Sequence, residues 1–155
     1  RGVNNKIDKI QERALRYVYG DDVRSFKDLL EMDGSVKVHH RNIQAMALEM
    51  FKVKNGSATE IMNNIFKINR NPNRPATRSF DSNPFCLPRA NTVHYGHDSL
   101  GYFGYKIWNL IPEEIRQKET VAGFKNAIKS WFPSICPCRL CQNYIGGVGY
   151  VTTHD

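Results

Sequence analysis

The sequence has no uninterrupted apolar stretch of the roughly 18 residues that a membrane-spanning helix needs. It also lacks a charged start followed by an apolar run, the pattern of a secretory leader. We therefore expect an intracellular protein with no membrane partner and, because residue 1 is arginine, a fragment of a longer chain. Acidic residues are the scarcer charge, with 15 Asp and Glu against 22 Lys and Arg. The net charge of +7 attracts polyanions, so RNA and DNA are the expected partners.

Cysteine is also scarce, but three of the four cysteines lie within six positions, at Cys136, Cys138 and Cys141. In an intracellular chain such a cluster favours a metal site over a disulfide framework. A tetrahedral zinc site needs four Cys or His ligands, and the local spacing supplies three. The fourth-ligand candidates are Cys86, His94, His97 and His154, and our predicted ligand set carries His154. Reduced cysteines packed under a loop are the alternative.

Helical periodicity covers most of the chain. Apolar residues recur at three- and four-residue steps over 4–19, with charged residues between them, as in an amphipathic helix. Similar patterns predict helices over 26–32, 38–54, 59–66, 99–110 and 120–131, with a further start at Pro112. Ser25 and Thr120 are the expected N-caps, and Pro133 stops the last helix. We predict a mainly α fold, a small bundle of amphipathic helices with an extended basic Pro-rich linker and an irregular Cys-containing tail.

Changes in composition divide the chain into four segments. We expect an N-terminal helical subdomain, a basic linker, a C-terminal helical pair and a Cys-rich tail, over 1–66, 67–98, 99–132 and 133–155. Four prolines exclude a long helix from the linker. Thr92–Tyr95 is a candidate short strand within it.

The linker is the predicted nucleic-acid-binding segment. Its arginines are interleaved with Phe80 and Phe85, the composition of a segment that follows phosphates and offers ring faces to bases. Such phosphate contacts position a protein on nucleic acid without reading its sequence. The predicted contacts are Arg70, Arg74, Arg78 and Arg89. A solvated linker whose arginines only aid solubility is the alternative.

One short motif matches the signature of a polymerase active site. Tyr19-Gly20-Asp21-Asp22 has the Y-x-D-D form in which paired carboxylates hold the metal ions of phosphoryl transfer. That chemistry needs a turn between buried strands and another carboxylate well upstream. Only 18 residues precede the motif, and their pattern is helical. We interpret it as a turn at a helix end and predict no catalytic residue in this chain.

Two other residue groups are assigned structural roles. His39 and His40 have no Ser or Cys partner at a position that would complete a nucleophile and base pair. The aromatic stripe of Tyr102, Phe103, Tyr105 and Trp108 has helical spacing, which is more typical of a core than of a base-stacking platform.

Six segments, spread over nearly the whole chain, resemble segments of one protein family and occur in the same order. They are Ile7–Arg16, Leu29–Val36, His39–Ile43, Glu49–Gly56, Lys106–Pro112 and the tail Cys136–Cys141. Together they resemble the region C-terminal to the polymerase core in LINE-type (jockey-like) non-LTR retrotransposon reverse transcriptases. The tail is similar in place to the C-terminal cysteine motifs of such elements, although it lacks a clear fourth ligand.

The resemblance implies a role as part of an RNA-directed DNA polymerase. The polymerase palm and the endonuclease would lie upstream in the same polyprotein and would be partners of this region. A thumb-like and post-thumb region would grip template RNA and primer or target DNA within a nuclear and cytoplasmic ribonucleoprotein. Because many copies of such elements are decayed, a translated relic is a further alternative.

Three hypotheses follow from the sequence. The leading one is a nucleic-acid-binding accessory region without the polymerase active site. The second is a structural or protein-interaction helical module that packs on the missing polymerase core and ignores nucleic acid by itself. The third, a free-standing polymerase or nuclease, needs carboxylates that the chain does not assemble.

Overall fold

The structure is a computed structural model that describes residues 3–20, 23–69, 84–89, 91–92, 96, 99–134, 136, 142–145 and 148–151, with the backbone alone for 3–5 and for the last two ranges. These residues form seven helices and one two-stranded sheet. The helices are α1 (Val3–Tyr19), α2 (Phe26–Asp33), α3 (Val38–Lys54), α4 (Glu60–Ile65), α6 (Leu100–Leu110), α7 (Glu113–Arg116) and α8 (Val121–Ile128). The predicted mainly α fold is confirmed.

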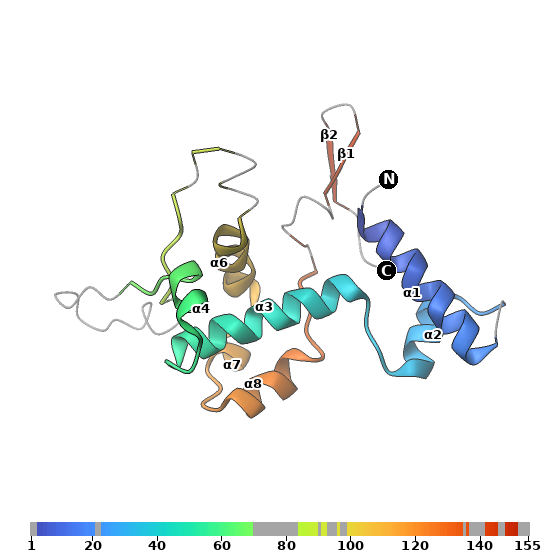
Figure 1. Ribbon diagram of the computed structural model, residues 1–155, viewed down its shortest axis with the longest axis horizontal. Helices are drawn as coiled ribbons and strands as arrows, with labels where there is room; N and C mark the ends of the chain where they lie inside the picture. Colours follow the sequence, from blue (N-terminus) through green and yellow to red (C-terminus); the bar gives the residue numbers. More distant parts are fainter. Residues whose placement is uncertain are drawn as a thin grey trace.

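Helix α3 is the central element of the fold. Helices α1 and α2 lie at its N-terminal end, whereas α4, α6, α7 and α8 gather along the rest of it (Figure 1). Its buried side consists of Ile43, Met46, Ala47, Met50, Phe51 and Val53. This is the apolar stripe that the 3.6-residue periodicity predicts for one side of a helix. The stripe packs mainly against α6 and α8.

The main core is aromatic. Phe51 of α3 stacks on Phe124 of α8 with ring centroids 4.2 Å apart, and Trp108 of α6 lies 6.1 Å from Phe124. All three side chains are fully buried, so the prediction that Trp108 belongs to the core is confirmed. Burying one such ring contributes roughly 1.5 to 3 kcal/mol relative to leaving it exposed, which makes this cluster the centre of stability.

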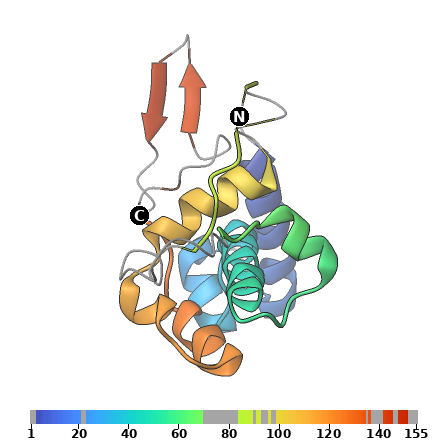
Figure 2. The same cartoon turned by 90° about the vertical axis from the view of Figure 1, so that its left-hand side faces the viewer.

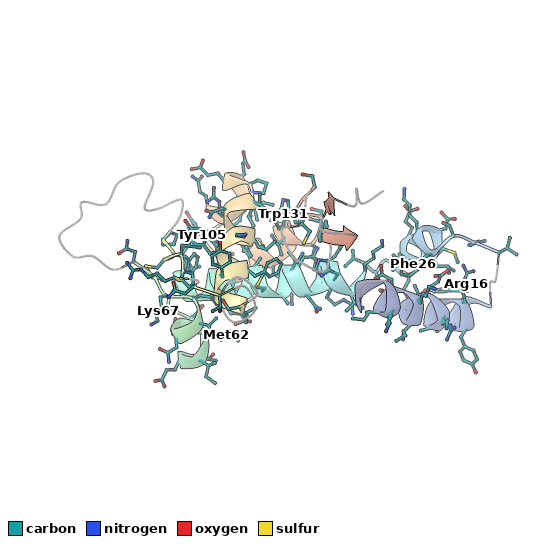
Figure 3. The ribbon with its side chains drawn as sticks, turned by 90° about the horizontal axis from the view of Figure 1, so that it is seen from above. Arg16, Phe26, Met62, Lys67, Tyr105 and Trp131 are labelled. Carbon is teal, nitrogen blue, oxygen red and sulfur yellow. The ribbon has the colours of Figure 1, made fainter. Side chains whose placement is uncertain are left out.

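A smaller cluster joins α1 to α2. It consists of Leu15, Leu29 and Leu30, with Phe26 packed against it (Figure 3). Helix α2 begins where the sequence predicts, because the Ser25 hydroxyl accepts a hydrogen bond from the Asp28 backbone N–H in a capping box. It ends at Gly34, whose φ of 65° is the left-handed conformation that glycine adopts without a Cβ clash.

Side chains of α1 also fix the start of α3. The Gln11 amide donates to the Val36 carbonyl at 3.0 Å, and its oxygen accepts from the Val38 N–H at 3.1 Å. The N-cap residue of α3, Lys37, makes no side-chain capping bond, so Gln11 satisfies a backbone donor that the helix leaves open. Lys37 pairs with Asp8 of α1 at 3.7 Å.

The main core crosses the predicted segment boundaries. Its buried residues run from Ile43 to Cys136 and draw on all four of the expected segments. Phe85, from the predicted linker, is buried and meets Trp108 edge to face at 5.0 Å. Phe85 is therefore a core residue, which corrects the expectation that it offers a ring face to bases. The division into four segments stays a prediction about composition.

The expectation of an irregular tail is wrong for part of it. Strands β1 (Gln142–Ile145) and β2 (Val148–Val151) pair antiparallel, with Ile145 opposite Val148. Two glycines separate short runs that contain Tyr, Ile and Val, which is a sequence signal for a tight hairpin. The hairpin stands outside the helical body in both views (Figures 1 and 2). The candidate strand over Thr92–Tyr95 lies largely outside the described residues.

Candidate nucleic-acid interface and metal centre

Two stretches of the predicted linker, residues 67–69 and 84–86, pair with each other beside the helical body. Ile68 and Phe85 form an antiparallel bridge, the Asn69 N–H donates to the Pro84 carbonyl at 2.8 Å, and the Cys86 N–H donates to the Lys67 carbonyl at 2.8 Å. We call residues 67–69 and 84–86 the linker neck. Because Phe85 is buried beside Trp108, the neck is anchored in the main core.

Of the predicted phosphate contacts, only Arg89 lies among the described residues, and it is exposed just beyond the neck. Arg70, Arg74 and Arg78 lie outside them, as does Phe80. Lys67, within the neck, is exposed as well. The described part of the linker therefore presents the cations Lys67 and Arg89 to solvent and buries the Phe85 side chain.

A second basic surface lies on α1 and was not among the predicted sites. Lys6, Lys9 and Arg13 are exposed, and their spacing of three and four residues places them on one side of the helix. We call these three residues the α1 basic face. Next to it on the helix are Tyr17, 91% exposed, and Ile10, 67% exposed.

The α1 basic face is not neutralised by the acids of its own helix, because those acids pair with other residues. The two carboxylates of α1 are engaged elsewhere, Asp8 with Lys37 and Glu12 with Arg16 at 2.6 Å. Within the part of the chain that the structure describes, no ion pair involves Lys6, Lys9 or Arg13. The three- and four-residue spacing could have identified this face from the sequence. The Glu12–Arg16 pair has the four-residue spacing of a local helix pair, whereas the pairing of Asp8 with Lys37 is decided only by the fold.

The α1 basic face and the linker neck are far apart. Figure 3 shows Arg16 of α1 and Lys67 of the neck at opposite ends of the long axis of the molecule. A short oligonucleotide would therefore contact one basic region, whereas a strand that engages both must run along the body.

The start of α3 meets the segment that follows α8. His39 Nε2 lies 3.3 Å from Cys136 Sγ, across 97 residues of sequence. The expectation that His39 has no cysteine partner is therefore wrong. Cys136 is buried, with 4% of its surface exposed, and His39 is half-buried. A pairing at this sequence separation leaves no local pattern from which it could be predicted.

Four contacts hold the segment after α8 along α3. The Gln44 amide donates to the carbonyls of Lys129 and Trp131 at 3.0 and 3.2 Å. Phe132 stacks on His40 with ring centroids 3.5 Å apart and meets His39 edge to face at 6.1 Å. Helix α8 ends at Ile128, earlier than predicted, and Gln44 binds two of the carbonyls that follow its end.

The predicted zinc ligands are only partly placed. Cys138, Cys141 and His154 lie outside the described residues, as do the alternative ligands His94 and His97. Cys86 is exposed in the linker neck. Among the described side chains, no group of three or more His, Cys, Asp or Glu residues could hold a metal ion. The structure places His39 beside one of the predicted ligands, Cys136.

The described half of the Y-x-D-D motif, Tyr19 and Gly20, lies at a helix end and a turn, as predicted. Helix α1 ends at Tyr19, and Gly20 has a φ of 61°. The Tyr19 hydroxyl donates to an Asp33 carboxylate oxygen at 3.0 Å. The Ser35 side chain and this bond lower the pKa of Asp33, and the bond to Asp33 raises the pKa of Tyr19. Asp21 and Asp22 lie outside the described residues.

Comparisons with protein-family models, curated proteins and solved structures found no match to this chain. None of the described helices combines the length and the apolar character that crossing a membrane requires.

Proposed function

We propose that this chain is an accessory region of a retrotransposon reverse transcriptase that binds template RNA or the primer or target DNA. It would work beside upstream polymerase and endonuclease domains in a nuclear and cytoplasmic ribonucleoprotein. The ordered family resemblance and the charge of +7 support this proposal. The observation that carries it is the α1 basic face, three exposed cations left by the diversion of both α1 carboxylates to other partners.

The α1 basic face suits a phosphate backbone. Lysine and arginine on one helix side neutralise phosphates and release their counterions, and this is the sequence-independent part of nucleic-acid affinity. Tyr17, at the edge of the face, adds an exposed ring on which an unpaired base can stack. Such a surface grips nucleic acid without selecting a base sequence, as an accessory region that follows a moving template needs.

The predicted linker arginines form the second part of the proposed interface. Arg70, Arg74, Arg78 and Arg89 would contact phosphates at the end of the molecule where the linker neck is anchored. Two weak contact regions on one strand act together, because binding at the first raises the effective concentration at the second. A long strand should therefore bind much more tightly than a short one.

The test is fluorescence anisotropy of the full chain with short and long single-stranded RNA and with duplex DNA, over a salt series. The triple variant Lys6→Gln, Lys9→Gln and Arg13→Gln removes the α1 basic face. The slope of log affinity against log salt should fall by about 2 to 3, since each lost phosphate contact removes about 0.7 to 0.9. The quadruple Arg→Gln variant of the linker should abolish the preference for long strands.

A matched control removes the same charge elsewhere. Lys118, Lys125 and Lys129 are exposed near α8, and changing all three to Gln lowers the net charge equally. If this control weakens binding as much as the α1 variant does, net charge rather than the α1 basic face explains the affinity. Failure of the unaltered chain to bind any probe at low salt would refute the proposal.

A second candidate function is docking on the polymerase core. Ile10, Val18 and Val23 are 67%, 70% and 96% exposed, so the α1–α2 end presents apolar surface as well as charge. If docking is the role, Val18→Ser and Val23→Ser should weaken binding to the purified polymerase domain and leave nucleic-acid binding intact. Nucleic-acid binding lost in the α1 basic-face variant, with unchanged domain docking, would favour the first function.

A further inference from the structure

Helix α1 carries an exposed apolar stripe in addition to the side chain that it buries. Leu15 is buried in the smaller cluster. In contrast, Ile10 and Tyr17 are 67% and 91% exposed, Ala14 is exposed and Ile7 is half-buried. We call Ile7, Ile10, Ala14 and Tyr17 the α1 seam. Their steps of three, four and three residues are those of the two core positions, a and d, of a coiled-coil heptad.

This spacing places the four side chains along one side of the helix, where a second helix can pack against them. Exposed apolar side chains with charged neighbours mark interaction sites. We propose that the α1 seam binds an amphipathic helix with an acidic edge, supplied by a protein partner. The proposal gives the docking function above a defined partner chemistry, and it does not rest on nucleic-acid binding.

The charges beside the α1 seam specify the partner. In heptad terms, Ile7 and Ala14 take position a. The residues before them, Lys6 and Arg13, take position g, which lies at the contact between two paired helices. Both cations are exposed, and within the part of the chain that the structure describes no ion pair involves either of them. Acidic residues on the facing edge of a partner would pair with them, whereas lysine or arginine there would be repelled.

The other edge of the α1 seam belongs to the helical body. Gln11 and Val18 take position e. The Gln11 side chain is bonded to the Val36 carbonyl and to the Val38 N–H at the start of α3. That edge is therefore tied to α3, and the charges that a partner helix can meet beside the α1 seam lie on the edge formed by position g.

A second copy of this chain does not supply an acidic edge. In an antiparallel pair of α1 helices, position g faces position g, which would set Lys6 and Arg13 against the same cations of the other copy. In a parallel pair, position g faces position e, where the chain carries Gln11 and Val18. Neither arrangement brings an acid to the cations, and like charges at facing positions disfavour a complex. The α1 seam therefore suits a different helix.

The test is binding of fluorescent synthetic peptides to the full chain, followed by anisotropy. The acidic probe is three heptads long, with leucine at positions a and d and glutamate at positions e and g. Repulsion between its own glutamates opposes self-association of the probe. One control peptide has lysine in place of glutamate, and another has the composition of the acidic probe in scrambled order. The chain should bind the acidic probe more tightly than either control.

Two variants separate the apolar stripe from its charged edge. Ile10→Ser should weaken binding of the acidic probe at least about tenfold, because the complex would bury this isoleucine side chain. The double variant Lys6→Glu and Arg13→Glu should reverse the preference, so that the basic peptide binds and the acidic probe does not. Lys118→Glu with Lys129→Glu changes the net charge equally at exposed positions near α8 and should keep the original preference. Far-UV circular dichroism checks that each variant keeps its helices.

Four results would overturn the proposal. Absence of binding, or equal binding of the acidic and scrambled peptides, would show that the α1 seam does not recognise an acidic helix. Equal binding of the acidic and basic peptides would mean that apolar contact alone is responsible. Full affinity in Ile10→Ser would place the peptide elsewhere. Dimerisation of the chain in sedimentation that Ile10→Ser abolishes would make a second copy the occupant. No nucleic acid enters these assays, so they are decided separately from the proposed function.

Discussion

The two ends of α3 are built in different ways. Around its C-terminal part, Phe51, Trp108 and Phe124 are fully buried and stacked in one aromatic core. At its N-terminal end, α1 and α2 share a cluster of only three buried leucines. The end with the smaller core also displays the α1 basic face and exposed apolar side chains.

This difference bears on the proposed function. A residue buried in a core cannot contact a partner, and the less packed α1–α2 end is the one that carries the proposed nucleic-acid-binding surface. Regions with few buried contacts open more easily than the rest of a protein. We therefore expect the α1–α2 end to exchange its amide hydrogens faster than the aromatic core, and to gain protection when a partner binds.

The largest expected effect comes from the aromatic core. Phe124→Ala should lower the free energy of unfolding by about 3 to 5 kcal/mol, because it removes a fully buried ring that stacks on Phe51. The same change at half-buried Phe26 should cost no more than about 2 kcal/mol. Urea denaturation measures both. Equal losses would mean that the two ends do not differ in packing.

Helix α6 provides a sharper probe of close packing. A Cβ on Gly104 would lie 2.4 Å from a Phe66 ring carbon and 3.1 Å from the Met50 sulfur. Gly104→Ala should therefore destabilise by about 1 to 3 kcal/mol, although alanine favours helix elsewhere. Leu110→Ala, half exposed on the same helix, is the control. Thermal unfolding that ranks the control as the more damaging change would contradict this packing.

At the other end, the start of α2 depends on a cap rather than on a core. Ser25→Ala removes the capping box with Asp28 and should cost about 1 kcal/mol. Exposed Ser134, which caps none of the helices that the structure describes, gives a matched serine control. The loss should appear first as faster hydrogen exchange within α2. No change in α2 exchange would show that Leu29 and Leu30 alone hold the helix.

The smallest expected effect is a change in proton binding. Asp33 has a lowered pKa, so its contacts stabilise the fold above its usual pKa and are lost as pH falls through the lowered value. The raised pKa of Tyr19 acts in the opposite direction, stabilising until pH rises through the folded-state value. In Tyr19→Phe, the Asp33 pKa, followed by NMR, should move up. An unchanged Asp33 titration would assign the whole shift to Ser35 and the other charges nearby.

Local sequence patterns predicted much of the fold. The six buried positions of α3, the Ser25 and Thr120 caps and the end of α1 at Tyr19 all follow from periodicity and capping within a few residues. The same local patterns contain the hairpin signal in the tail, where two glycines separate strand-forming residues.

The sequence by itself determined which segments become helices and that the chain carries excess positive charge, because both depend on residues a few positions apart. Tertiary structure decided that Phe85 is buried, that Asp8 of α1 is diverted to Lys37, and that His39 meets Cys136. These outcomes depend on contacts between residues far apart in the chain. No local pattern records such contacts, since they form only when α3 gathers the other helices around it.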